Sequence, residues 1–162
     1  MFFSALPTDA GVERKEMAVK AGERNTPDTP QKRQLDAAWE ARELALYTIK
    51  ICTNKNIFLP EYQSALTDDI IRKAKDIYTN VWTANNIRVD GHKELWIWRN
   101  RLQKQAVMDC NNLLALIGLA RSLFHLKGKK VKYWSEKTLK TLLFGKLNAA
   151  VSIRLKRVFQ ST

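Results

Sequence analysis

The chain has 162 residues and carries 28 Lys and Arg against 16 Asp and Glu, a formal net charge of +12, with 45% apolar residues. This length suits one compact domain, and the apolar share excludes a chain that is disordered throughout, because enough surface can be buried to offset the ordering entropy. The positive surplus indicates an anionic partner, first of all nucleic acid, rather than any particular fold.

Residues 1–34 differ from the rest of the chain, since they mix Gly, Pro and alternating charges and hold few large apolar residues after Leu6. We expect a mobile N-terminal tail, with a short helix over residues 12–21 as an option on binding. Pro7 and Asp9 interrupt the apolar start and no basic stretch precedes it, so no signal peptide is expected. No apolar run approaches about 18 residues, which predicts no membrane span and a cytoplasmic protein.

From residue 36 onward the apolar residues follow a helical period. The first predicted helix covers residues 36–54, with apolar positions at mostly three- and four-residue steps from Trp39 to Ile51. The second is predicted to start at Thr67, whose hydroxyl would cap the helix ahead of two aspartates, and to end near residue 86. Its apolar stripe includes Trp82.

Two further helices are predicted in the second half of the chain. A turn at residues 90–91 leads into a helix of roughly eight turns that Gly128 would close, and Ser135 would open the last helix, whose stripe includes Leu139 and Leu143. Connections of modest length make successive helices antiparallel neighbours. The sequence therefore predicts an all-α, up-down-up-down four-helix bundle over residues 35–160, preceded by the tail of residues 1–34.

The residue types that catalysis needs are not arranged in any recognisable pattern. Cys52 and Cys110 are 58 positions apart without a CxxC motif, which predicts buried thiols in a reducing, cytosolic setting. His92 and His125 are expected beside helix ends. No metal-ligand spacing, paired carboxylates or phosphate-binding glycine loop occurs in the sequence. We therefore expect a protein that is not an enzyme and that has no metal or cofactor.

Positive charge is concentrated near the carboxyl end. Residues 127–162 hold ten cationic residues and one acidic residue, a net charge of +9, whereas the first 126 residues hold eighteen against fifteen. Such a stretch predicts binding to phosphate backbones, with an affinity that falls as salt rises. The alternative is a solvated helix face that only keeps the protein soluble.

A second basic cluster, Arg99, Arg101 and Lys104, follows two tryptophans in the third predicted helix. Trp98 shares the core stripe, whereas Trp96 lies off it. Trp96 could stack on a base or contact another subunit, and a partly buried position in the bundle is the alternative. Nothing in these residues specifies a base sequence.

Several segments resemble a known family. Residues 58–60 (Phe-Leu-Pro) before a helix, and residues 66–77 running on to 85, resemble the second helix of small bacterial four-helix-bundle proteins. That group includes proteins encoded by intervening sequences in 23S ribosomal RNA genes and the accessory variability determinant, Avd, of diversity-generating retroelements. Residues 110–114, 124–126 and 133–135 are more similar to the Avd-like branch. The resemblance covers residues 36–158 and leaves the tail outside.

The resemblance implies a noncatalytic subunit that assembles as a barrel-like homopentamer, binds the reverse transcriptase of the retroelement and holds template RNA or DNA on basic residues. It brings no catalytic residues. The basic surface of the family matches, in this chain, Lys129, Lys130, Lys132, Lys137, Lys140, Arg154, Lys156 and Arg157. The chain departs from the short form of the family by its 34-residue leader.

These observations lead to one hypothesis and two alternatives. The hypothesis is a nucleic-acid-binding accessory subunit of a reverse transcriptase that performs mutagenic retrohoming. The first alternative is a protein–protein interaction module of the intervening-sequence type, whose charge only aids solubility. An enzyme is the third class, and a cluster of titratable residues in a cleft would favour it.

Overall fold

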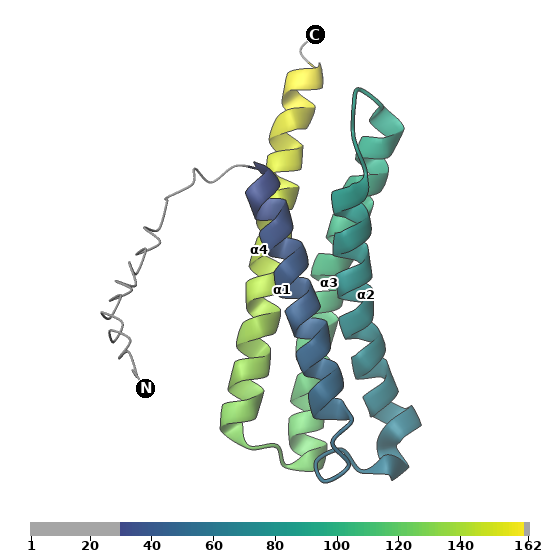
Figure 1. Cartoon of the computed structure of the whole chain (residues 1–162), viewed down its shortest axis with the longest axis vertical. Coiled ribbons are helices and arrows are strands. Elements are labelled where there is room, and N and C mark those ends of the chain that lie inside the picture. The colour runs from purple at the N-terminus through teal and green to yellow at the C-terminus, as the bar shows by residue number, and fades with distance from the viewer. Residues whose placement is uncertain (1–29, 161–162) are drawn as a thin grey trace, which may run out of the picture.

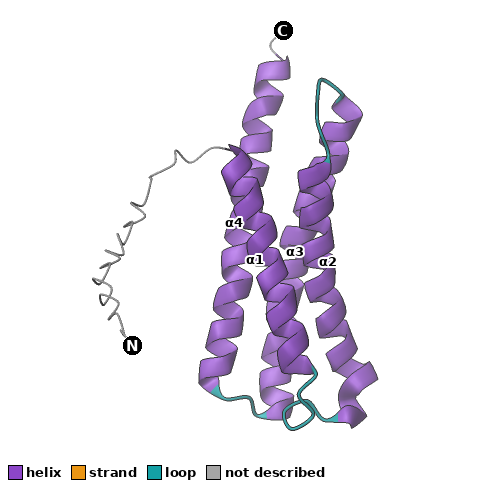
Figure 2. Cartoon of the chain, in the orientation of Figure 1, coloured by secondary structure: helices purple, strands orange, loops and turns teal. Residues whose placement is uncertain are grey.

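The structure is a computed structural model that describes residues 30–160, and it describes side-chain surroundings over residues 36–146. This part of the chain forms four long helices and no strand, which confirms the all-α prediction (Figure 2). Two single helical turns join the first two helices. The predicted tail lies outside the described residues except for residues 30–34. The four helices are α1 (Pro30–Cys52), α2 (Asp68–Asn86), α3 (Lys93–Phe124) and α4 (Gly128–Gln160).

The helices run alternately up and down in a bundle (Figure 1). Both α1 and α3 pack against α2 and α4, so α1 and α3 lie diagonally across the core. We call the end that holds residues 53–67 and 125–127 the lower end. The upper end holds the α2–α3 connection and the C-terminal turns of α4. The core is built from residues at helical spacing, with Leu44, Ile70, Ile77, Leu113 and Ile117 each at most 1% exposed.

The predicted starts of the first two helices need correction. α1 begins at Pro30 rather than residue 36, so the boundary predicted between tail and bundle falls inside a helix. Proline suits the first turn of a helix, where its missing N–H has no partner to lose. Thr67 does not cap α2, because its backbone is already helical and its side chain makes no capping hydrogen bond. A single wide turn, Gln63–Thr67, runs directly into α2 instead.

The α3–α4 connection is also shorter than predicted. α3 ends at Phe124, and His125 closes it in the left-handed conformation with φ of 49°. Gly128 starts α4 rather than closing α3, and Ser135 lies inside α4 rather than at its start. The early start of α4 places Trp134 within the helix, where it is fully buried and anchors α4 against α1.

Several residues predicted to face the core are exposed. Trp39, Trp82 and Trp98 are 60%, 54% and 49% exposed, and Leu139 and Leu143 are also exposed. Trp96, off the predicted core stripe, is half-buried, which agrees with the expected alternative of a partly buried position, whereas Trp98, predicted on the stripe, is exposed. A period of 3.6 residues admits more than one apolar stripe, and only the neighbouring helices decide which one is covered.

The longest apolar helix in the described part of the chain is α3. By length and composition alone, α3 is long and apolar enough to cross a membrane, and no other helix in the described residues is. The same properties belong to a helix packed between two others, as α3 is between α2 and α4.

Candidate nucleic-acid interface

Four lysines gather at the lower end of α4. The backbone N–H groups of Lys130 and Val131 both donate to the carbonyl oxygen of Lys127, at 2.9 and 3.2 Å, which fixes the first turn. Lys127, Lys129 and Lys130 are exposed and form no ion pair with any described residue. We call Lys127, Lys129, Lys130 and Lys132 the lower cationic end.

The fourth lysine of this set has only a weak acidic neighbour. The ammonium of Lys132 lies 3.8 Å from the carboxylate of Glu136, and both side chains are mostly exposed, at 77% and 60%. An ion pair of this kind adds little stability, because water and salt screen it. The Lys132 charge therefore remains available to an anionic partner.

The position of the lower cationic end is electrostatically unfavourable for the free protein. Unpaired N–H groups give a helix N-terminus a positive potential, which stabilises acidic residues and destabilises lysine. The first turn of α4 nevertheless has no acidic residue. Its lysines repel both one another and the helix end, and a bound phosphate would relieve both repulsions.

The middle of α4 has cations that already have partners. The ammonium of Lys140 lies 2.6 Å from the carboxylate of Glu40 on α1, whose side chain is only 15% exposed. Lys137 is half-buried, with its ammonium 5.3 Å from the centroid of the Tyr133 ring. Both residues were predicted in the basic surface. Glu40 offsets the charge of Lys140, whereas Lys137 keeps its net charge and lies about two helical turns from Lys130.

A second group of cations lies toward the upper end. Arg101 and Lys104 on α3 are exposed. Arg99, predicted with them, is half-buried, and this burial lowers the pKa of its guanidinium. The Nε atom of Arg99 is buried without a hydrogen-bond partner among the described residues. Arg99 therefore belongs to the packing of the bundle more than to its charged surface.

The remaining predicted residues, Arg154, Lys156 and Arg157, lie in the last turns of α4. Their side chains are outside the described set, and their backbone positions are at the upper end (Figure 1). Lys146 is exposed on the same helix and was not among the predicted site residues, although the charge count included it. Lys146 lies near the middle of α4. We call Arg101, Lys104, Arg154, Lys156 and Arg157 the upper cationic end.

The predicted basic surface is therefore divided into two groups. From Lys130 to Arg154 there are 24 helical residues, which correspond to about 36 Å at 1.5 Å per residue. Charge counting found the cationic stretch but could not show this division. The pairing of Lys140 with Glu40 joins residues 100 positions apart, and nothing local to either residue indicates it.

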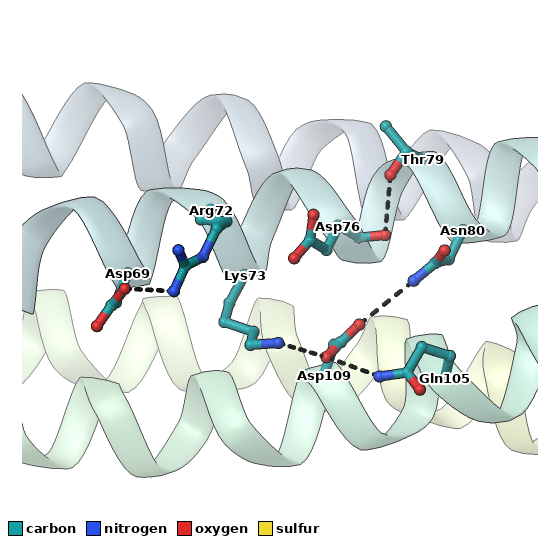
Figure 3. A network of polar contacts seen from close by, with 8 residues as sticks. All are labelled: Asp69, Arg72, Lys73, Asp76, Thr79, Asn80, Gln105 and Asp109. Atoms are coloured by element: carbon teal, nitrogen blue, oxygen red, sulfur yellow. Dashed lines mark hydrogen bonds and ion pairs between the residues drawn. The ribbon is translucent and has the colours of Figure 1, made fainter.

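The most prominent buried charge is structural in character (Figure 3). Asp109 on α3 is 1% exposed and accepts hydrogen bonds from Lys73 at 2.9 Å, Gln105 at 3.2 Å and Asn80 at 3.3 Å. Lys73 and Asn80 belong to α2, so the network joins two helices in one register. A carboxylate whose oxygens accept three such bonds is satisfied within the bundle.

Other reactive groups in the described residues do not form a site. No three His, Cys, Asp or Glu side chains there come close enough to hold a metal ion. Cys52 and Cys110 are free and buried, and burial raises the pKa of each thiol to about 12. Asp109 adds to the rise at Cys110. Both thiols are therefore protonated and unreactive at neutral pH.

Comparisons of the chain with protein-family models, with curated proteins and with solved structures find no match.

Proposed function

We propose that the protein is a noncatalytic, nucleic-acid-binding accessory subunit of a diversity-generating retroelement reverse transcriptase, of the Avd-like type. In this proposal it holds template RNA or DNA on its cationic ends and is required for mutagenic retrohoming in the cytoplasm. The role in a retroelement rests on the family resemblance described above. The binding of nucleic acid rests on the charge of the structure itself.

The observation that supports binding most strongly is the lower cationic end. Three exposed lysines, with no acidic partner among the described residues, stand at the N-terminus of a long helix, where cations destabilise the free protein. If solubility were the only role, the charges would be equally effective spread over the surface, without this local repulsion. Phosphate groups would turn the repulsion into attraction.

Filter binding of a structured RNA tests this proposal. Lys129→Glu with Lys130→Glu should weaken binding at low salt by tenfold or more, since two attractions become repulsions. The matched control changes Lys50 and Lys75, exposed lysines on α1 and α2, to Glu. The control has the same net charge and should bind nearly as the unchanged protein does. Undetectable binding at low salt, or equal losses in both variants, would contradict the proposal.

The homopentamer is the second part of the proposal. Exposed apolar side chains occur on two helix pairs, with Trp39 and Trp82 on α1 and α2, and Met108, Leu139 and Leu143 on α3 and α4. Apolar surface on two different faces suits a head-to-tail ring, in which one face of each copy covers the other face of the next. Light scattering at micromolar concentration should give five copies, and a monomer would contradict this part.

The same apolar side chains favour the second candidate, a protein–protein interaction module of the intervening-sequence type. Copurification from cells separates the two functions. A reverse transcriptase together with its RNA should accompany the accessory subunit, and neither should accompany the interaction module. The control is the variant with Lys129→Glu and Lys130→Glu, which should lose the RNA.

A further inference from the structure

We propose that Tyr133 is a stacking platform for an unpaired base of the nucleic acid whose phosphate groups bind the lysines around it. This inference rests on the proposed function and names the class of ligand, which is a single strand or the loop of a folded RNA or DNA. Its basis is an aromatic ring that is half exposed among cations on one side of α4.

Helical spacing places three lysines on the same side of α4 as Tyr133. Lys129 and Lys130 precede Tyr133 by four and three residues, and Lys137 follows it by four. Residues at these spacings are neighbours on a helix surface, so each lysine lies within about 60° of Tyr133 around the helix axis. Lys132, one residue before Tyr133, is about 100° away and belongs to another side. Tyr133 therefore has cations one turn below it and one turn above it.

The ring of Tyr133 is both accessible and held in place. The residue is 48% exposed. Its ring contacts that of Tyr47 on α1 in a T-shaped arrangement, with centroids 4.9 Å apart, and Tyr47 in turn contacts buried Trp134. A tyrosine that packing already holds loses little conformational freedom when a ligand stacks on it. Tyr133 therefore offers apolar contact area at a low entropic cost.

The contact between Lys137 and Tyr133 is one that a ligand can replace. The ammonium of Lys137 lies 5.3 Å from the centroid of the Tyr133 ring. Such a contact is weak at an exposed site. The flexible stem of lysine lets the ammonium move from the ring to a phosphate group while a base covers the ring.

Acidic residues near the site have cationic partners of their own. Glu136, three residues after Tyr133, is the single acidic residue of residues 127–162. Its carboxylate lies 3.8 Å from the ammonium of Lys132, so these two charges offset each other. On α1, Glu43 is paired with Arg42 at 3.0 Å. The three lysines beside Tyr133 have no acidic partner among the described residues, so the site keeps a net positive charge.

The proposed homopentamer uses other surfaces. The contact with Tyr47 places Tyr133 on the side of α4 next to α1, whereas the ring contacts on α3 and α4 are made by Met108, Leu139 and Leu143. Leu139 lies about 9 Å above Tyr133 along α4 and about 120° around its axis, and Leu143 is about 15 Å above. Assembly of the ring therefore does not require the surface around Tyr133.

The arrangement favours an unpaired base over a duplex. Lys130 and Lys137 are separated by about 10 Å along α4, roughly three nucleotides of one strand at 3.4 Å each, and Tyr133 lies between them. In a duplex the bases stack on one another, so a side chain outside the grooves meets only phosphate and sugar. In a single strand or a loop, a base can stack on the ring while neighbouring phosphate groups pair with the lysines.

Two DNA oligonucleotides with the same number of phosphate groups test the inference. One consists of thymidines, and in the other every base is replaced by an abasic sugar. The unchanged protein should bind the thymidine strand about fivefold or more tightly than the abasic strand, because a stacked base adds to the attraction between charges. Equal affinities would overturn the stacking platform. Undetectable binding of both strands at low salt would instead overturn the proposed function.

Variants of Tyr133 assign the difference to this ring. Tyr133→Ala should remove most of the preference for the thymidine strand and leave the affinity for the abasic strand nearly unchanged. Tyr133→Phe keeps a ring and should keep the preference, whereas Lys129→Glu with Lys130→Glu should weaken both strands alike.

Two outcomes in the alanine variant would overturn the inference. If the preference for thymidine persists, the base stacks elsewhere, and if both strands lose affinity equally, Tyr133 acts only through the structure of the helix. Circular dichroism melting checks that the variant folds. Tyr133→Leu, which keeps apolar volume against Tyr47 but has no ring, takes its place if it does not, with the same expected loss of preference.

Discussion

The lower and upper halves of the bundle are packed from different kinds of side chain. In the lower half the Phe58 and Phe124 rings lie 4.6 Å apart, and Phe58 also contacts buried Trp134 edge-on at 6.3 Å. In the upper half all four helices contribute to the lining of a small cavity, which is made mostly of the small residues Ala37, Ala84, Ala106 and Gly145 together with Val81, Asn85 and Gln103. Large rings bury apolar area, whereas small residues let helices approach closely.

This difference in packing determines which substitutions should destabilise each half. The lower half should be sensitive to losing volume, since its stability comes from a few large side chains. The upper half should be sensitive to gaining volume, since its helices are already in close contact at Gly145. Substitutions that remove side-chain volume in the lower half and add it in the upper half therefore test the two kinds of packing separately.

The largest expected effect is that of Trp134→Ala in the lower half. Trp134 is fully buried, contacts Tyr47 and Phe58, and donates a hydrogen bond from Nε1 to Thr48 Oγ1 at 2.9 Å. The variant should lose about 3–5 kcal/mol of unfolding free energy, measured in urea. Trp134→Phe keeps an aromatic ring but not the hydrogen bond, so it should lose clearly less. A loss below about 1 kcal/mol for the alanine variant would contradict aromatic anchoring of the lower half.

The network at Asp109 lies between the two halves and should give the next largest effect. Asp109→Ala leaves Lys73 and Asn80 without their acceptor, and should cost about 2–3 kcal/mol, less than a fully buried pair because Lys73 is 28% exposed. Asp109→Asn, which keeps an acceptor, should cost less. Urea unfolding measures both, and a neutral result for the alanine variant would mean that the network does not hold α2 against α3.

In the upper half, Gly145→Ala should cost about 1–2 kcal/mol despite the better helix propensity of alanine. The new Cβ would lie 2.9 Å from Val107 Cγ2, on a side chain that has little rotamer freedom. Val107→Ala removes that methyl group, so the double variant should recover part of the loss. Additive losses in a double-mutant cycle would show that the two helices are not in tight contact there.

The titration of the two thiols comes last, because it has no effect on stability at neutral pH and acts only in alkaline solution. Burial raises the pKa of Cys52 and Cys110 from 9.0 to about 12. The unfolded chain therefore loses its thiol protons first, and their contribution to stability is complete below pH 9 and is lost as pH rises to about 12. Urea unfolding of Cys52→Ala with Cys110→Ala should show a weaker fall of stability over this interval. An identical pH profile for the variant and the unchanged protein would contradict burial of the thiols.

The sequence predicts the number of helices correctly, but not where each one starts or which of its apolar residues are buried. Periodicity predicts four helices because a buried stripe recurs every 3.6 residues, and it identifies Ile70 and Ile77 correctly. It misplaces the starts of α1 and α4, because Pro30 and Gly128 tolerate helix and loop conformations alike and packing decides between them. The exposure of Trp98 likewise depends on neighbouring helices.

For the candidate interface, counting charge identifies the cationic stretch, since charge is a property of composition. The loss of Lys140 from it depends on Glu40, which only the antiparallel approach of α1 and α4 brings near. The separation of the two cationic ends follows from the length of α4, which the sequence predicts seven residues too short at its start. Long-range contacts set these properties, and local patterns do not contain them.

The central claim is that free lysines at the start of α4 contact phosphate groups. The salt dependence of nucleic-acid binding tests this claim most directly. A plot of the logarithm of the association constant against that of salt concentration should have a steep negative slope. Lys129→Glu with Lys130→Glu should make this slope shallower by about 1 for each phosphate group that the variant no longer binds. An unchanged slope, or a slope near zero in the unchanged protein, would contradict the claim.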